Sequence, residues 1–187
     1  MSDHPSRSAA QVPVQPLLDR HLVERIWRRD TTVWNAQPDS DVGRAIANRL
    51  GWLDVPTGMR AELDAVEAVA EQVRRDGIRI VYLLGMGGSS LCAEVMRSVY
   101  GVRDGYPELV VMDTTDEAAI AGALARLDPG QTLFLVSSKS GGTIEPASME
   151  RLYFAAVERA LGKDAGRQFV AVTDPGTGLA KLASERG

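Results

Sequence analysis

The sequence predicts an α/β protein whose parallel, doubly wound sheet is covered by helices on both faces. From Arg79 onwards, apolar segments of strand length alternate strictly with helical patterns. Such alternation is typical of a three-layer α/β/α domain with right-handed crossovers. The strand segments are also nearly continuous apolar runs, and runs of this kind indicate burial on both faces and hence a parallel sheet.

The residues before this alternation have only polar or helical patterns. We expect residues 1–15, which are polar and contain two prolines, to form a disordered tail. A helical prefix then covers residues 16–57, with helices over Pro16–Arg29 and Asp41–Leu50. A longer helix over Gly58–Arg75 precedes the first strand and stops at Gly77. The inward stripe of that helix is expected to consist of Leu63, Val66, Val69, Ala70 and Val73.

The alternating region forms one domain, which we place at residues 58–187. A glycine at the end of a helical pattern is a normal helix stop before a further strand, and Gly187 is the last residue. We therefore expect this domain to be incomplete at its C-terminal end. The expected strands are Arg79–Leu84, Glu108–Asp113, Thr132–Ser137 and Gln168–Thr173, and the expected helices are Ser89–Tyr100, Asp116–Leu127, Thr143–Leu161 and one from about Gly178.

Composition excludes several classes of function. A net charge of -4 and a pI of about 5.3 argue against a nucleic-acid-binding protein. No stretch is long and apolar enough for a membrane span, and no signal-peptide core is present at the N-terminus. Cys92 is the single cysteine, which fits a cytoplasmic protein, and we expect it in the core. His4 and His21 lack a cluster of possible ligands, so no metal is expected.

Two Ser/Gly-rich loops carry the functional signal. The first, Gly85-Met86-Gly87-Gly88-Ser89-Ser90, and the second, Ser138-Lys139-Ser140-Gly141-Gly142-Thr143, each follow an apolar strand and lead into a helix. A helix N-terminus attracts phosphate through unpaired N–H groups and a partial positive charge. Both loops lie at the carboxyl edge of the predicted sheet, where ligands bind. We therefore expect the two loops to hold one anionic small molecule.

The first loop has two alternative interpretations. Gly85-x-Gly87-x-x-Ser90 resembles a dinucleotide fingerprint, with Asp113 placed where a ribose-binding acid would follow the second strand. The loop could also be a purely structural turn. The second loop favours a phosphosugar, because it offers several hydroxyl groups at one helix N-terminus. Helix capping by Ser138 and Thr143 is compatible with this interpretation, and capping is also the expected role of Asp113, Asp116 and Asp174.

The second loop with the following Ile144-Glu145, together with the first loop, resembles the sugar isomerase (SIS) domain and more narrowly the glucose-6-phosphate isomerases. Asn48-Arg49-Leu50-Gly51-Trp52-Leu53 and Val172-Thr173-Asp174-Pro175 resemble the branch fused to transaldolase in bacteria. The resemblance covers roughly residues 20 to 187. It implies a first SIS domain with flavodoxin-like strand order, preceded by the helical prefix.

The resemblance also implies a function. The intact family enzyme interconverts glucose 6-phosphate and fructose 6-phosphate without a cofactor, and it could be a homodimer. The implied substrate-binding residues are Gly88, Ser89, Ser138, Lys139, Ser140, Gly141, Gly142 and Thr143. Gly142 is a departure, because relatives usually have threonine there.

The family's ring-opening histidine and lysine, its catalytic glutamate and its arginine come from sequence beyond the matched region. Neither histidine of this chain matches the ring-opening histidine, and Glu145 is not the family's base. No catalytic residue is therefore assigned in this chain, which we expect to be inactive by itself. A non-catalytic phosphosugar-binding module and a dinucleotide-binding oxidoreductase domain remain as alternatives.

Overall fold

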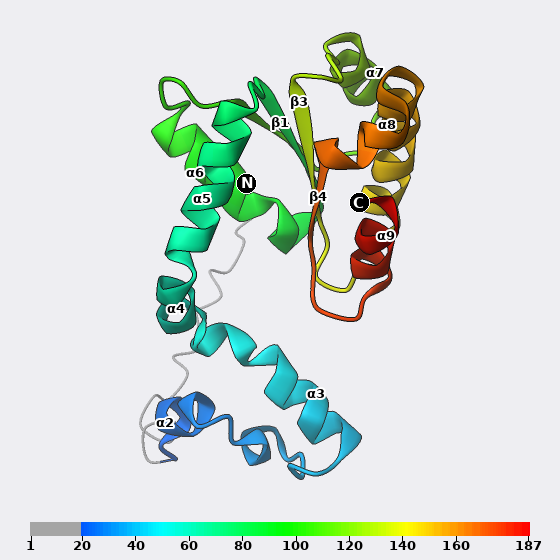
Figure 1. Ribbon diagram of the computed structural model, residues 1–187. Coiled ribbons are helices and arrows are strands. Elements are labelled where there is room, and N and C mark those ends of the chain that lie inside the picture. Colours follow the sequence, from blue (N-terminus) through cyan, green and yellow to red (C-terminus); the bar gives the residue numbers. More distant parts are fainter. Residues whose placement is uncertain (1–19) are drawn as a thin grey trace, which may run out of the picture. The chain divides into compact units, whose positions relative to one another are not determined.

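The computed structural model describes residues 20–187. The expected tail over residues 1–15 and the beginning of the helix expected from Pro16 lie outside the described residues. The chain divides between Val66 and Glu67 into two compact units. The first unit is helical, and the second contains the sheet (Figure 1).

The first unit consists of short helices. The helix expected over Asp41–Leu50 is confirmed as α3 (Asp41–Arg49), with Ser40 as its N-cap. The helix expected from Gly58 begins only at Leu63, because two short turns precede it, the first with a proline in its opening turn. The elements are α2 (Leu22–Trp27), η1 (Thr31–Trp34), α3, η2 (Gly51–Leu53), α4 (Val55–Gly58), η3 (Met59–Ala61) and the first turn of α5 (Leu63–Arg75).

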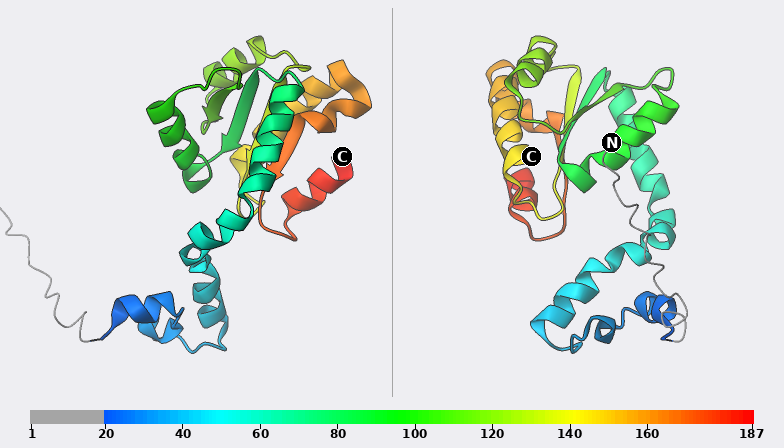
Figure 2. Two further views of the ribbon diagram at one scale, coloured as in Figure 1. Left: turned by 60° about the vertical axis from the view of Figure 1, so that its left-hand side comes forward. Right: turned by 180° about the vertical axis from the view of Figure 1, so that it is seen from behind.

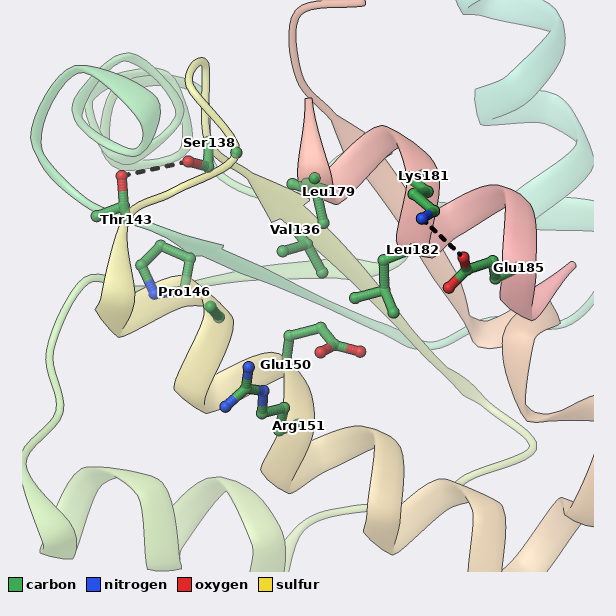
Figure 3. Close-up of a pocket in the computed structure, with 13 residues that line it drawn as sticks. Val136, Ser138, Thr143, Pro146, Glu150, Arg151, Leu179, Lys181, Leu182 and Glu185 are labelled. Atoms are coloured by element: carbon green, nitrogen blue, oxygen red, sulfur yellow. Dashed lines mark hydrogen bonds and ion pairs between the residues drawn. The ribbon is translucent and has the colours of Figure 1, made fainter. Parts of the chain in front are cut away.

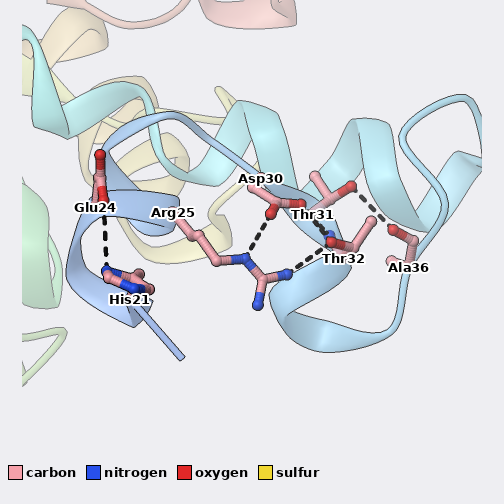
Figure 4. Close-up of polar contacts among 7 residues, drawn as sticks. All are labelled: His21, Glu24, Arg25, Asp30, Thr31, Thr32 and Ala36. Atoms are coloured by element: carbon pink, nitrogen blue, oxygen red, sulfur yellow. Dashed lines mark hydrogen bonds and ion pairs between the residues drawn. The ribbon is translucent and has the colours of Figure 1, made fainter. Parts of the chain in front are cut away.

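A network of polar side chains fixes the corner between α2 and η1 (Figure 4). Asp30 caps η1 by accepting a hydrogen bond from the backbone N–H of Thr32 at 2.9 Å. Its carboxylate accepts a second hydrogen bond from Nε of Arg25 at 2.7 Å. Arg25 also donates to the Thr32 hydroxyl at 2.8 Å. The hydrogen bond from the Thr32 hydroxyl, followed by that from Arg25, lowers the pKa of Asp30 to about 2. This corner is therefore held by a carboxylate that stays charged well into acid.

All three tryptophans of the chain lie in the first unit. Trp27, Trp34 and Trp52 are 58%, 45% and 63% exposed. Few apolar side chains are buried in the described part of this unit, and Leu50 and Leu53 are among them. The first unit thus has little core of its own in the described residues.

The second unit has the three-layer α/β/α architecture that the sequence predicts. Its strands pair in parallel in the order β2-β1-β3-β4, which is the flavodoxin-like order. Helices α5 and α6 lie on one face of the sheet and α7, α8 and α9 on the other (Figures 1 and 2). The elements are β1 (Ile80–Gly85), η4 (Gly87–Ser89), α6 (Leu91–Tyr100), β2 (Glu108–Met112), α7 (Glu117–Ala125), β3 (Thr132–Ser137), α8 (Ile144–Leu161), η5 (Gly162–Gln168), β4 (Phe169–Val172) and α9 (Gly178–Arg186).

The main core lies between the sheet and α8. Tyr82 and Phe134, on adjacent strands, stack with ring centroids 5.6 Å apart, and Phe134 stacks on Tyr153 of α8 at 4.9 Å. Burial raises the pKa of Tyr153 to about 12. A smaller cluster on the opposite face contains Val81 and receives Val73 of α5. Side chains therefore alternate between two packed faces along each central strand, as the apolar runs predict.

Two expectations about the core are wrong. Cys92 is exposed, because Ser90 takes the buried position at the start of α6 after the turn of η4. Of the stripe expected on α5, Val73 packs into the core, whereas Leu63, Val66 and Val69 are 50%, 53% and 53% exposed and Ala70 is exposed as well. None of the helices between residues 20 and 187 has the length and apolar character needed to cross a membrane.

Candidate functional site

The strand register brings the two Ser/Gly loops together. β1 and β3 are adjacent and parallel, and the last residue of β1, Gly85, pairs with the last residue of β3, Ser137. A Cβ on Gly85 would lie 3.0 Å from the carbonyl oxygen of Ser89 and 3.2 Å from that of Ser137. Glycine at this position therefore lets the first loop fold closely against the end of β3.

The first loop is a tight turn with open N–H groups at its start. Gly87 has a φ of 54°, and the N–H groups of Ser89 and Ser90 donate to Met86 and Gly87 carbonyl oxygens at 3.1 Å each. The first N–H groups of such a turn, those of Gly87 and Gly88, have no acceptor within it. Gly88 is exposed and Ser89 half-buried, so both are accessible to a ligand.

The second loop is closed by its own hydroxyl groups. The Ser138 hydroxyl donates to Oγ1 of Thr143 at 3.2 Å, and the N–H of Gly142 donates to Oγ of Ser140 at 3.3 Å. The N–H of Gly141 donates to the Ser138 carbonyl oxygen at 3.1 Å. Ser138 is buried, Gly141 and Thr143 are half-buried, and Lys139, Ser140 and Gly142 are exposed. All eight residues predicted to bind substrate thus lie in two neighbouring loops.

The helices after both loops begin without a side-chain cap. Thr143 is the N-cap residue of α8, but its hydroxyl is engaged by Ser138 and not by the helix. Ser90 is the N-cap residue of α6, and its hydroxyl donates to the Gly87 carbonyl oxygen at 3.1 Å. The alternative role of Thr143 as a capping side chain is therefore not observed. Free N–H groups and the positive ends of both helices remain available to an anion.

Of the three aspartates expected to cap helices, Asp116 does so and Asp174 does not. Asp116 caps α7 by accepting the N–H of Ala119 at 2.9 Å. Asp174 does not cap α9, because Thr177 does so by accepting the N–H of Ala180 at 3.1 Å. Asp113 follows β2 and is exposed. Within residues 20–187, no three His, Cys, Asp or Glu side chains are grouped so that they could hold a metal ion.

A cavity of about 320 Å³ adjoins the second loop and lies between α8 and α9 (Figure 3). Ser138 and Thr143 line the side next to the second loop, and Arg151 of α8 and Lys181 of α9 also line the cavity. Its apolar wall includes Val136, Leu179 and Leu182. The loop hydroxyls are therefore reached from a space large enough for a small polar molecule.

Glu150 also lines this cavity, and sequence reasoning missed it. Its side chain is 5% exposed and accepts a hydrogen bond from Arg186 near the end of α9, whose guanidinium lies 3.7 Å from the centroid of the Phe154 ring. Burial lowers the pKa of Arg186. The signal in the sequence was a charged residue within the apolar stripe of α8 that contains Met149 and Tyr153.

Comparison with known proteins identifies the relatives of this chain. No protein-family model matches it. Among curated proteins, it is 32% identical over 146 residues to the glucose-6-phosphate isomerase of Staphylococcus epidermidis, a match that covers 74% of this chain and 33% of that enzyme. The enzyme of Rubrobacter xylanophilus is 32% identical over 154 residues, covering 78% of this chain and 35% of the enzyme. This chain is related to the glucose-6-phosphate isomerases.

Solved structures agree with this relationship. A glucose-6-phosphate isomerase from Chlamydia trachomatis superposes with a TM-score of 0.54 and 26% identity, over 82% of this chain and 28% of that chain. A hypothetical protein from Thermus thermophilus superposes with a TM-score of 0.65 and 27% identity, over 94% of this chain and 40% of that one. The chain spans about a third of the length of the curated glucose-6-phosphate isomerases that it matches.

Proposed function

We propose that the chain supplies the phosphate-binding part of a glucose-6-phosphate isomerase, which interconverts glucose 6-phosphate and fructose 6-phosphate. One observation carries the proposal: two Ser/Gly loops meet at the paired ends of β1 and β3, each before a helix that lacks a side-chain cap. A phosphate group would supply the acceptor oxygens that these two helix ends lack. The relationship to glucose-6-phosphate isomerases supports the choice of sugar.

Each loop contributes different groups to the proposed binding site. In the proposal, the hydroxyls of Ser140 and Thr143 and the N–H groups of the second loop donate to the phosphate oxygens. Gly88 and Ser89 reach the same ligand from β1. Lys139 adds positive charge near the site, since its side chain is exposed and free to turn toward the anion. Hydrogen bonds to an ionised acceptor are stronger than those between neutral groups, and in the proposed site several of them are donated to one phosphate.

The proton-transfer step requires acid–base residues, and none can be assigned among the residues of this chain. A general base must lie within hydrogen-bond reach of the proton at the sugar carbon. Glu145 lies in the first turn of α8, and His21 lies in the other unit. Acid–base residues, and a homodimeric assembly if one forms, would belong to the intact enzyme. The single cysteine, Cys92, fits the proposed location in the reducing cytoplasm.

Calorimetric titration with fructose 6-phosphate tests the phosphate assignment. A hydrogen bond to a charged group contributes about 1.5–3 kcal/mol, so Thr143→Val or Ser140→Ala should weaken binding roughly 10- to 100-fold. Ser148→Ala, on the exposed side of α8, is a matched control and should bind as the native chain does. Binding of unphosphorylated fructose should not change. Equal weakening for both sugars, or for neither, would show that these hydroxyls do not hold the phosphate.

A coupled assay tests the role of the chain in catalysis. Phosphate binding alone stabilises ground and transition states equally and does not raise the rate of the chemical step. We therefore expect no measurable formation of glucose 6-phosphate from fructose 6-phosphate by the purified 187-residue chain. Turnover that disappears in Glu145→Gln would identify a base within this chain and would contradict the proposal in its present form.

A further inference from the structure

The second Ser/Gly loop is tied to the loop that follows the next strand. The N–H of Ser138 donates to the carbonyl oxygen of Val172 at 3.0 Å, which continues the pairing of β3 with β4. Beyond it, the Lys139 carbonyl oxygen accepts two hydrogen bonds, from the N–H of Asp174 at 3.1 Å and from the Thr173 hydroxyl at 3.4 Å. The β4–α9 loop, residues 173–177, therefore holds the middle of the second Ser/Gly loop.

The Thr173 hydroxyl is in turn joined to the first turn of α9. Oγ1 of Thr177 accepts the N–H of Ala180 at 3.1 Å and lies 2.9 Å from Oγ1 of Thr173. Each hydroxyl has one proton to donate. Either hydroxyl can donate across the 2.9 Å contact between them. A relay of hydrogen bonds thus runs from the first turn of α9 to the backbone of the Ser/Gly loop.

The relay orients a backbone donor of the proposed phosphate site. In a trans peptide, the carbonyl group and the N–H of the next residue point in opposite directions, and the described residues contain no cis peptide. With the Lys139 carbonyl group turned to Thr173 and Asp174, the N–H of Ser140 points away from the β4–α9 loop. It is therefore left free for an acceptor outside that loop.

Close packing prevents the loop from shifting toward α9. Gly141 has a φ of 65°, and a Cβ there would lie 2.7 Å from Cβ of Thr177 and 3.1 Å from the backbone nitrogen of Leu179. Distances below 3 Å are not tolerated between such atoms, so the Gly141 backbone rests directly on the start of α9. Hydrogen bonds and packing fix the same segment from one side.

We infer that Thr173 and Thr177 are positioning residues, which hold the second Ser/Gly loop in the shape that presents the Ser140 N–H to the substrate phosphate. The inference rests on the proposed function. Neither threonine contacts the ligand. Loss of the Thr173 hydroxyl would leave the loop hydroxyls in place but would remove one of the two hydrogen bonds that hold the Lys139–Ser140 peptide, and loss of the Thr177 hydroxyl would remove the support of Thr173.

Thr173→Val in the full chain is the direct test, because it removes both hydrogen bonds of this hydroxyl and leaves the cap of α9 intact. We expect affinity for fructose 6-phosphate to fall about 3- to 10-fold, as for the loss of a neutral hydrogen bond. Thr173→Ser should restore it. Hydrogen exchange at the N–H of Gly141 should be faster in Thr173→Val, with or without sugar.

Two controls separate this inference from the proposed function. Asp116→Ala removes the N-cap of α7, which has nine residues like α9, and should lower the melting temperature without changing affinity. Thr143→Val reports on the phosphate site itself. If Thr143→Val weakens binding and Thr173→Val changes neither affinity nor exchange at Gly141, the positioning role is wrong and the proposed function stands. If Thr143→Val has no effect, the proposed function fails, and unchanged exchange in Thr173→Val would then overturn the positioning role as well.

Discussion

Helices of the second unit begin in two different ways. Asp116 caps α7 and Thr177 caps α9, and in each case a side-chain oxygen accepts an N–H of the first turn. The helices that follow the Ser/Gly loops, α6 and α8, have no such bond, although Ser90 and Thr143 occupy their N-cap positions. Both residues are of types that cap helices well. Their hydroxyls are engaged by the loops instead, which leaves two helix ends open at neighbouring strand ends.

The largest expected effect comes from giving α8 a charged cap of its own. Thr143→Asp should stabilise the helix by about 0.5–1 kcal/mol, because aspartate is a better N-cap residue and favours the positive end of the helix. The same carboxylate would repel a phosphate. Affinity for fructose 6-phosphate should fall by roughly 100-fold or more, because like charges about 4 Å apart near a protein surface cost several kcal/mol. Calorimetric titration and urea denaturation measure the two changes.

Thr143→Asn is the matched control for this prediction. Asparagine caps a helix about as well as aspartate but has no charge. It should raise stability in the same way and weaken binding less than Thr143→Asp does. If the two variants bind fructose 6-phosphate equally, the anion does not lie at the start of α8.

For α7, which is capped by the Asp116 side chain, we expect a loss of stability and no change in ligand affinity. Asp116→Ala removes the acceptor of the Ala119 N–H and should lower the free energy of unfolding by about 1 kcal/mol. Binding of fructose 6-phosphate should remain unchanged, because α7 begins after β2 and not after a Ser/Gly loop. Urea denaturation followed by circular dichroism measures the first quantity. A loss of affinity at Asp116 as large as that at Thr143 would remove the distinction between the two kinds of helix start.

The smallest effect concerns the capped turn η1 in the first unit. The pKa of Asp30 is about 2, below its ordinary value of 3.8, so the carboxylate stabilises the fold above pH 3.8 and this contribution is lost as the pH falls toward 2. Asp30→Asn should flatten the pH dependence of unfolding within that window, as measured by acid titration of tryptophan fluorescence. An unchanged profile in Asp30→Asn would contradict the lowered pKa.

Much of the second unit follows from the sequence because its signals are local. The predicted bounds of the third strand, Thr132–Ser137, match β3 residue for residue, and α9 begins at Gly178 as expected. A continuous apolar run between polar turns leaves little freedom in the placement of a buried strand. The placement of both Ser/Gly loops at one sheet edge follows in turn from the parallel topology, as the pairing of Gly85 with Ser137 demonstrates.

What the sequence leaves undetermined depends on tertiary contacts. Serine and threonine can cap a helix, close a loop or join two loops, and only the neighbouring atoms decide among these roles for Thr143, Thr173 and Thr177. The position of Cys92 was mispredicted because the turn of η4 places Ser90 inward. The stripe on α5 was mispredicted because helical periodicity shows which residues share a face but not how much of that face another element covers.

The division at Val66 and Glu67 also separates two kinds of chromophore. Every tryptophan precedes the division, and all four tyrosines follow it, two of them, Tyr82 and Tyr153, in the stacked core. Excitation at the red edge of the indole band would therefore report on the helical unit alone, whereas near-ultraviolet tyrosine signals would follow the sheet. Unfolding of the two units can be monitored separately in one native, unlabelled sample.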